Sequence, residues 1–345
     1  MSSATATGTE FSGQVPAAAR AEGEEVPPGL GPNRLAWRRL KRNRVALGFG
    51  TLFTVIVALC LLAPVYAGDI AHTTANVNHI TDKVAGQYVV STQGIPVGPT
   101  WHSHFLLGAD ANGRDEAVRL LYGGRNSLEV GVGAMLITVL FAVILGTVAG
   151  YFRGVTDGVI TRLLDVIWAY PAILLGVALG ATLAVSGIDL GLFSLHGNSL
   201  AVPMAVIGVV YVPYVAKPIR GQVLTLRERE FIDAARQQGL SHIRIMATEL
   251  LPNLASTIVV FVPLILANAI LLEAALSYLG AGVQAPNPSW GTMISDGLRS
   301  PGIPAAFHLV LVPGIMLVLA VLSINVFGDG LRDALDPRAK VRIAH

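Results

Sequence analysis

The first long apolar stretch of the chain, Val45 to Ala67, reads VALGFGTLFTVIVALCLLAPVYA and contains no charged residue. A helix of these 23 residues reaches about 35 Å, enough to cross a hydrocarbon core of roughly 30 Å. A signal peptide is the alternative, because Val65-Tyr66-Ala67 resembles a small-residue cleavage site. The apolar core is too long for a signal peptide, and 44 residues precede it. We therefore predict a membrane-spanning helix.

Five more apolar runs follow, and together they predict six spans. They cover approximately residues 127–150, 163–186, 200–216, 255–280 and 306–328. Of all residues, 53% are hydrophobic and 13% charged, whereas roughly a quarter are charged in an average soluble domain. Because the apolar residues form long runs rather than a periodic stripe, lipid is their natural solvent. The predicted fold class is an all-α integral membrane protein with six transmembrane helices.

The flanking charges predict the orientation, since basic residues prefer the cytoplasmic side. The segment from Val26 to Arg44, directly before the first span, carries six basic residues and no acid: Arg34, Arg38, Arg39, Lys41, Arg42 and Arg44. Threading six spans from a cytoplasmic N-terminus also places residues 151–162, residues 217–252 and the C-terminus inside. The long segment 68–126 fits less well because it contains Lys83, Arg114, Arg119 and Arg125, but the rule is weak for long loops.

This threading divides the chain into five parts. They are a mostly disordered cytoplasmic tail (1–44), the first span (45–67), an extracytoplasmic loop (68–126), a transmembrane core (127–328) and a cytoplasmic tail (329–345). The first 33 residues are rich in Ala, Gly, Pro, Ser and Glu, a composition typical of disorder. No function is predicted for them.

Several classes of chemistry have no recognisable motif in this chain. No GxxxxGK[ST] phosphate loop, HExxH pair or Cys/His cluster with metal-ligand spacing occurs. The single cysteine, Cys60, is expected to pack inside its apolar run, and a net charge of +2 gives no reason to expect nucleic acid. We therefore predict no catalytic, cofactor-binding or metal site. If the chain takes part in pumping, another protein supplies the energy.

The segment 225–252, between the fourth and fifth apolar runs, carries the most specific pattern. It contains Arg229-Glu230-Phe231-Ile232-Asp233-Ala234-Ala235-Arg236-Gln237-Gln238-Gly239 and ends at Leu251-Pro252. Two short helices are predicted: Gly239 ends the first, Ser241 caps the second, and Pro252 prevents its continuation. The small side chains of Ala234 and Ala235 are expected to leave a face that another protein can approach closely.

This pattern resembles the EAA coupling loop of bacterial ABC-importer permeases, in which an acidic residue, two alanines, three residues and a glycine precede Leu-Pro. The resemblance implies that Asp233, Ala234, Ala235, Gly239, Leu251 and Pro252 couple the chain to an ATPase subunit. Asp233 stands in place of the glutamate, and Glu249 in place of an aliphatic residue. The alternative is an ordinary basic amphipathic surface helix. Glu273-Ala274-Ala275 also spells EAA, but it lies inside the fifth span.

Further stretches resemble the C-type permeases of dipeptide and oligopeptide importers. They are Leu107 to Asp115, Arg119 to Leu128, Arg162 to Asp165, Glu273 to Gly280 and Gly328 to Arg338. The resemblance implies a type I importer permease fold in the bacterial inner membrane. It also implies four partners: a homologous B-type permease, one or two ABC ATPase subunits, an extracytoplasmic peptide-binding protein and the lipid bilayer. The expected function is a non-catalytic permease for dipeptides or oligopeptides.

Individual polar residues allow two interpretations each. Asp165 and Glu273 lie within spans, where they would either line the path or its gate, or accept hydrogen bonds from a neighbouring helix; the second is favoured. The Asp-Gly-Arg cluster at residues 110–115 is by itself more typical of a solvated turn. Two small-xxx-small pairs, Gly146 with Gly150 and Gly176 with Gly180, predict close helix packing.

Three rival functions stay open at this stage. A permease of the same family could import nickel complexes or another small solute, and no residue excludes it. An ion-driven secondary transporter would show internal repeats and discontinuous helices, but no repeat is visible in the sequence. A membrane-anchored scaffold is the third possibility.

Overall fold

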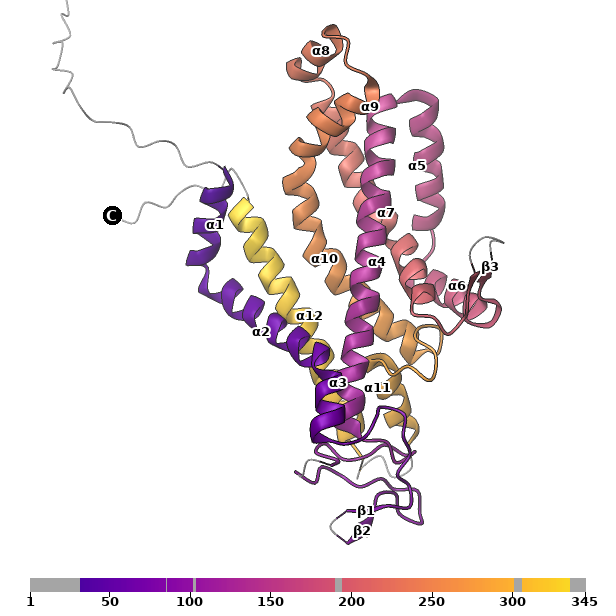
Figure 1. Cartoon of the computed structure of the whole chain (residues 1–345). Coiled ribbons are helices and arrows are strands. Elements are labelled where there is room, and N and C mark those ends of the chain that lie inside the picture. Colours follow the sequence, from indigo (N-terminus) through magenta and orange to yellow (C-terminus); the bar gives the residue numbers. More distant parts are fainter. Residues whose placement is uncertain (1–31, 85, 102–103, 190–193, 301–305, 336–345) are drawn as a thin grey trace, which may run out of the picture.

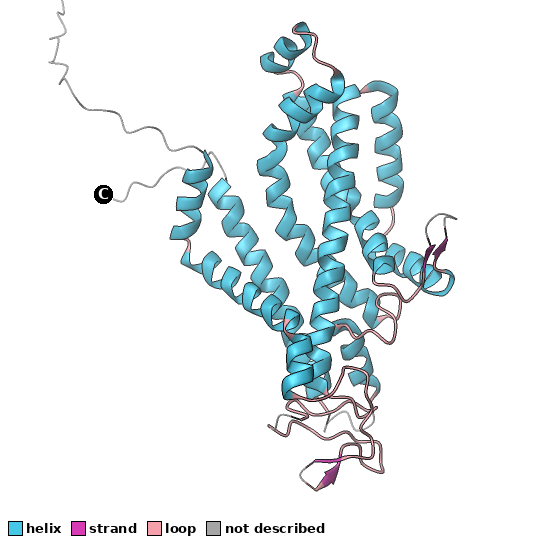
Figure 2. Cartoon of the chain, in the orientation of Figure 1, coloured by secondary structure: helices cyan, strands magenta, loops and turns pink. Residues whose placement is uncertain are grey.

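The computed structural model describes residues 32–84, 86–101, 104–189, 194–300 and 306–335, and helices dominate them (Figures 1 and 2). The helices are α1 (Pro32–Arg42), α2 (Arg44–Leu61), α3 (Ala63–Val65), α4 (Glu116–Phe152), α5 (Gly154–Trp168), α6 (Ala172–Ser186), α7 (Ala201–Leu226), α8 (Glu230–Gln237), α9 (His242–Ile245), α10 (Leu251–Tyr278), α11 (Trp290–Arg299) and α12 (His308–Leu335). Two π-helical turns are η1 (Tyr66–Ile70) and η2 (Met246–Leu250). Two antiparallel hairpins pair β1 (Lys83–Val84) with β2 (Gln87–Tyr88) and β3 (Ile188–Asp189) with β4 (Ser194–Leu195).

The membrane spans number six, as the apolar runs predict, only if one bent pair of helices counts as a single span. Among the described residues, five continuous helical stretches are long and apolar enough to cross a bilayer. Helices α5 and α6 meet that test only together, and they are bent by 87° at the break between them. The expected single helix over residues 163–186 is therefore wrong. Pro171 caps α6 without donating a backbone N–H and disfavours helical conformation at Tyr170, so the helix stops there.

Close contact between α4 and α7 forms the centre of the bundle, as Figure 1 shows. A Cβ atom added at Gly146 would lie 2.7 Å from the Ala216 carbonyl oxygen, and one at Gly150 would lie 2.9 Å from that of Arg220. Gly176 and Gly180 likewise let α6 approach Leu276 and Ala281. Both small-residue pairs therefore serve helix packing, as predicted.

The two ends of the bundle differ. At one end, called here the α8 end, the chain forms α8, α9 and the turn between α4 and α5 (Figure 1). The opposite end, called the hairpin end, carries β1, β2 and α11 (Figure 1). Helix α4 begins at Glu116, well before the expected start of its span, and α11 lies in a segment predicted as a loop. Ser289 caps α11 and forms a capping box with Thr292.

The N-terminal region contains a helix where a mostly disordered tail is predicted. Helix α1 is basic and amphipathic, and its Leu40 is buried with Ala46 against Ala334 of α12. Helix α12 accordingly continues past the expected end at Gly328 to Leu335. Residues 1–31 and 336–345 of the predicted tails lie outside the described residues. Cys60 is buried and free, in agreement with its expected packing role.

Candidate functional site

The first part of the 225–252 segment folds as predicted: helix α8 ends at a corner, and a second helix, α9, begins after it. Helix α8 ends in a Schellman motif, in which the N–H of Gly239 donates to the carbonyl oxygen of Arg236 and that of Leu240 to Ala235. Gly239 has a φ of +76°, a conformation that glycine adopts at little cost. The hydroxyl of Ser241 then accepts a hydrogen bond from Arg244 N–H and caps α9. Local residue chemistry therefore fixes the corner between the two helices.

The two alanines of the motif lie on opposite faces of α8. Ala234 is exposed, as is Asp233, whose carboxylate pairs with Arg236 at 3.1 Å. Ala235 is 6% exposed and packs with Ile232 in the main hydrophobic core. The prediction that both alanines leave an open face is thus wrong for Ala235. A residue three positions after the buried Ile232 lies on the same face of a helix, so it faces the bundle.

The end of the segment also differs from prediction. Pro252 does not stop the chain between the second short helix and the fifth span. Helix α9, turn η2 and α10 form one helical stretch from His242 to Tyr278, and Pro252 lies in the first turn of α10. Proline is tolerated inside this stretch because a local π-helical adjustment such as η2 can re-satisfy the backbone groups that a proline leaves unpaired. Leu251 is half-buried and Pro252 exposed. A displacement of α9 can therefore pass directly into the fifth span.

The segment is anchored on the C-terminal end of α4. The Tyr151 hydroxyl lies 2.9 Å from His242 Nδ1, and its ring is within 5.7 Å of the Arg236 guanidinium. Arg227 donates to the Tyr151 carbonyl oxygen. Beside them, Arg153 pairs with Glu228 at 2.5 Å, and this hydrogen bond lowers the pKa of the Glu228 carboxyl. Tyr151 and Arg153 were not predicted as part of this site, because neither belongs to the 225–252 segment.

A cavity of about 760 Å³ opens between α7, α10 and α12. Its lining is mixed: Pro218, Gln222, Ser256, Thr257, Val260, Phe261, Leu264, Arg332, Asp333 and Leu335. Polar groups such as Gln222 and Thr257 are unusual on helices of this apolarity unless they face water or protein. These residues were not predictable from the sequence, because a single polar side chain inside an apolar run does not indicate which way it points.

Asp165 lies beside α7 and is more than half exposed. Its carboxylate pairs with Lys217 at 2.6 Å, and the Lys217 ammonium also lies 4.5 Å from the Trp168 ring centroid. Trp168 stacks on Tyr214. These contacts hold α5 against α7 directly before the 87° bend. Asp165 therefore has the ionic partner that a charge in an apolar span requires.

Glu273 is fully buried on α10, near the hairpin end of the bundle. It accepts a hydrogen bond of 2.6 Å from Ser277, whose hydroxyl oxygen in turn accepts one from Val283 N–H. The hydroxyl groups of Ser127 and Ser289 face the same carboxyl. The second EAA triplet is thus inside the bundle, as predicted. Glu273 and Asp165 do not come together with the 225–252 segment into one site.

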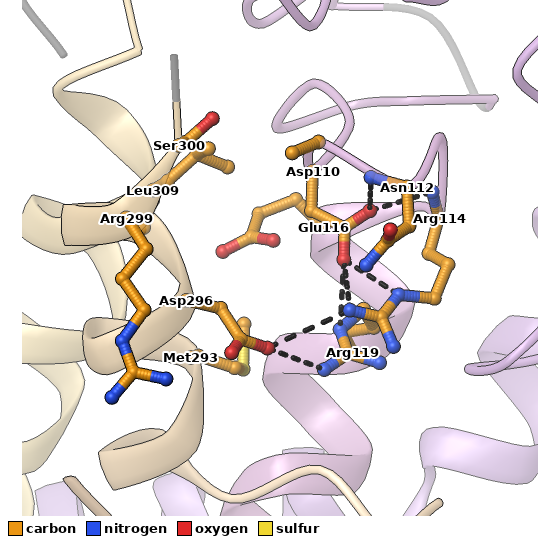
Figure 3. A pocket seen from close by; sticks show the side chains of 12 residues that line it. Asp110, Asn112, Arg114, Glu116, Arg119, Met293, Asp296, Arg299, Ser300 and Leu309 are labelled. Atoms are coloured by element: carbon orange, nitrogen blue, oxygen red, sulfur yellow. Dashed lines mark hydrogen bonds and ion pairs between the residues drawn. The ribbon is translucent and has the colours of Figure 1, made fainter. Parts of the chain in front are cut away.

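The Asp-Gly-Arg cluster is a largely buried ion network that reaches the surface at Asp296, not a solvated turn (Figure 3). Asp110 pairs with Arg114 at 2.6 Å and with Arg119 at 3.5 Å, and both arginines also approach Asp296 of α11. Asp115 accepts N–H bonds from Phe105 and Val118; its burial raises the pKa of the carboxyl, and these bonds partly offset the rise. The network joins segments far apart in sequence.

Comparison with known proteins agrees with this architecture. Residues 31–79 match the N-terminal TM domain of oligopeptide transport permease C. One chain of the MetNI methionine ABC transporter in its inward facing conformation superposes with a TM-score of 0.50 and 18% sequence identity, covering 63% of this chain and 96% of that one. At that identity, the match shows the fold alone. It confirms the predicted all-α importer permease fold.

Curated relatives cover nearly the whole chain. The dipeptide transport system permease protein DppC of Alkalihalophilus pseudofirmus is 36% identical, over 92% of this chain and 93% of the relative. The di/tripeptide transport system permease protein DppC of Pseudomonas aeruginosa is 34% identical, over 90% and 93%. The glutathione transport system permease protein GsiD of Pectobacterium atrosepticum is 32% identical, over 90% and 92%. Together with the family match over residues 142–341, they show that the chain belongs to the binding-protein-dependent transport system inner membrane components.

Proposed function

We propose that this chain is the permease subunit of an ATP-driven importer of dipeptides or other short peptides. The relatives named for dipeptides and di/tripeptides support the substrate class. The relative named for glutathione is consistent with it, because glutathione is itself a tripeptide. The chain acts without covalent chemistry, and its work is a change of conformation.

The exposed Asp233-Ala234 face of α8 is the observation that carries the coupling role. A small alanine beside an acidic residue lets the backbone of another protein come close, and α8 projects from the end of the bundle (Figure 1). The buried Ile232 and Ala235 hold the opposite face of α8 on the core. A push on this face moves α8 and α9 as a unit, and the helical continuity from His242 into α10 transmits it.

The 760 Å³ cavity is proposed as this chain's share of the translocation path. It opens along α10, the helix that receives the motion of α9, so closing the ATPase subunits would reshape it. Coupling of this kind requires one structural element whose conformational equilibrium is shifted both by the ATPase and by the translocation path. Helix α10 with its preceding turn η2 meets that requirement. Asp165 and Glu273 are not in the lining of this cavity. For them we favour the packing role.

The proposed assembly contains two permeases, one or two ATPase subunits and an extracytoplasmic peptide-binding protein in a bacterial inner membrane. The basic residues around α1 and in the 225–252 segment support a cytoplasmic location of the α8 end and of both termini. The hairpin end, with its long folded segment before α4, then faces the binding protein.

The test is ATP-driven uptake of a labelled dipeptide by the reconstituted complex. Ala234→Trp should abolish retention of the ATPase subunit on the purified membrane complex and should abolish uptake. Thr81→Trp introduces the same indole side chain at an exposed position of the hairpin end and should retain the ATPase. Retention and normal uptake with Ala234→Trp would refute the coupling role.

The same vesicles separate the rival functions. Uptake that proceeds without nucleotide would favour an ion-driven transporter. Uptake of nickel or another small solute in preference to dipeptides would change the substrate class and leave the coupling role intact.

A further inference from the structure

A second, smaller cavity lies at the hairpin end, remote from the 760 Å³ cavity. Its volume is about 190 Å³, and it lies between the loop before α4 and the helices α11 and α12 (Figure 3). Six charged residues line it: Asp110, Arg114, Glu116, Arg119, Asp296 and Arg299. Four of them form the ion network described above, with two acids and two arginines. Glu116 and Arg299 take no part in those ion pairs.

Glu116 is the unusual member of this lining. Glu116 is only 2% exposed, yet within the described part of the chain its side chain forms no hydrogen bond and no ion pair. Figure 3 shows its carboxyl group turned into the cavity, away from the paired arginines. Burying a carboxylate without a partner is costly. Burial raises the pKa of the Glu116 carboxyl well above its usual range, and a cation bound beside it would lower that pKa again by stabilising the charged form.

A cation in the cavity would supply the missing partner. A metal ion fits poorly, because hard cations require several oxygen ligands and the described residues hold no group of three or more acidic, His or Cys side chains suited to one. A single water needs about 10–15 Å³, so the cavity has room for a small organic molecule. A primary ammonium, with three N–H donors, suits one carboxylate in a cavity of this size.

Arg299 supplies the complementary charge. It is exposed at the mouth of the cavity, whereas Glu116 is buried inside it. A guanidinium group binds carboxylate oxygens in pairs. The two unused charges of this cavity are therefore opposite in sign and lie at different depths, an arrangement that is complementary to a zwitterion.

We propose that this cavity binds the ammonium end of a short peptide on Glu116, with the peptide carboxylate facing Arg299. The choice of a peptide rests on the proposed function, whereas the ammonium chemistry rests on Glu116 itself. In the proposed orientation the site lies at the extracytoplasmic side, where it would hold a peptide before it enters the path.

Binding to the purified full-length chain in lipid nanodiscs tests the site without ATP. The probes are alanyl-alanine, its N-acetyl derivative and its C-terminal amide, titrated by calorimetry. We expect N-acetylation to weaken binding at least tenfold, because it removes the charge that pairs with Glu116. Glu116→Gln should cause a similar loss, and Glu129→Gln, an exposed acid on the same helix, should not. Arg299→Gln should abolish the preference for the free carboxylate over the amide.

The comparison of probes on the wild-type chain keeps the test decisive even where Glu116→Gln fails to fold. Equal affinity for alanyl-alanine and its N-acetyl derivative would overturn the site. Uptake by the full complex separates this proposal from the previous one. ATP-driven uptake without ammonium-dependent binding refutes only the site, whereas a wild-type complex that transports no peptide refutes the proposed function.

Discussion

Replacing Gly146 with alanine should separate α4 from α7. The added Cβ would lie 2.7 Å from the Ala216 carbonyl oxygen, about 0.7 Å inside ordinary van der Waals contact at 3.4 Å. The obstacle is a backbone atom of a packed helix, which cannot rotate away as a side chain can. Overpacking of this kind costs about 1–3 kcal/mol. Alanine is the better helix former by about 0.5–1 kcal/mol, so part of the cost is offset.

The matched control is Gly48→Ala in α2, where no atom lies within 4 Å of the new Cβ. The gain in helix propensity is similar at both positions, so the difference between the variants isolates the overpacking cost of about 1–3 kcal/mol. The measurement is the free energy of unfolding of the purified chain in mixed micelles, titrated with a denaturing detergent. If the two variants unfold with the same free energy, the close α4–α7 contact does not support the bundle.

The same substitution should disturb transport more than assembly. Displacing α4 moves Tyr151, on which the 225–252 segment is anchored, without altering the exposed face of α8. We expect the ATPase subunit to stay bound while less peptide is imported for each ATP hydrolysed.

Three further predictions follow from single contacts. Tyr151→Phe removes the 2.9 Å contact with His242 at a cost of about 0.5–1.5 kcal/mol, and should lower the ratio of uptake to ATP hydrolysis in vesicles. Asp165→Asn leaves the Lys217 ammonium unpaired and should lower the unfolding temperature; adding Lys217→Met should restore both stability and uptake, unless Asp165 acts in the path. The pairing with Arg153 lowers the pKa of Glu228 in the folded chain from 4.5, so it stabilises the fold above that pH. This stabilisation is lost when the pH falls through the folded-state pKa. Glu228→Gln should remove that loss of stability in unfolding curves recorded from about pH 6 to pH 3.

Runs of apolar residues predicted the spans well, because a charge-free stretch of some twenty residues has few alternatives to lipid. The break between α5 and α6 was not predictable from Pro171 alone. Membrane helices tolerate proline in their interior, and Pro213, Pro263 and Pro313 all lie inside continuous helices here. Helix α11 was missed because it is short, although Ser289 and Thr292 carry a capping signal that could have located its start.

The candidate site was predictable where it depends on local chemistry. Gly239 and Ser241 define the corner between α8 and α9 through backbone preferences that neighbouring residues do not override. The burial of Ala235 could have been inferred from Ile232 three residues earlier, but the prediction rested on the small size of both alanines and not on their positions around the helix. The network of Asp110 and Asp296 could not be inferred, because these residues are far apart in sequence and each looks like a solvated charge.

Helix α4 connects the two sites described here. Its 37 residues extend about 55 Å, from Glu116 in the smaller cavity to Tyr151 beneath α9. The helix is continuous through Gly146 and Gly150, and both glycines lie against α7. A continuous helix packed along its side against a neighbour moves as a unit. Displacement of the 225–252 segment at one end of α4 therefore also shifts Glu116, which lines the smaller cavity at the other end. Peptide binding at Glu116 and ATPase docking at Ala234 should consequently affect each other's affinity by the same factor, as thermodynamic linkage requires.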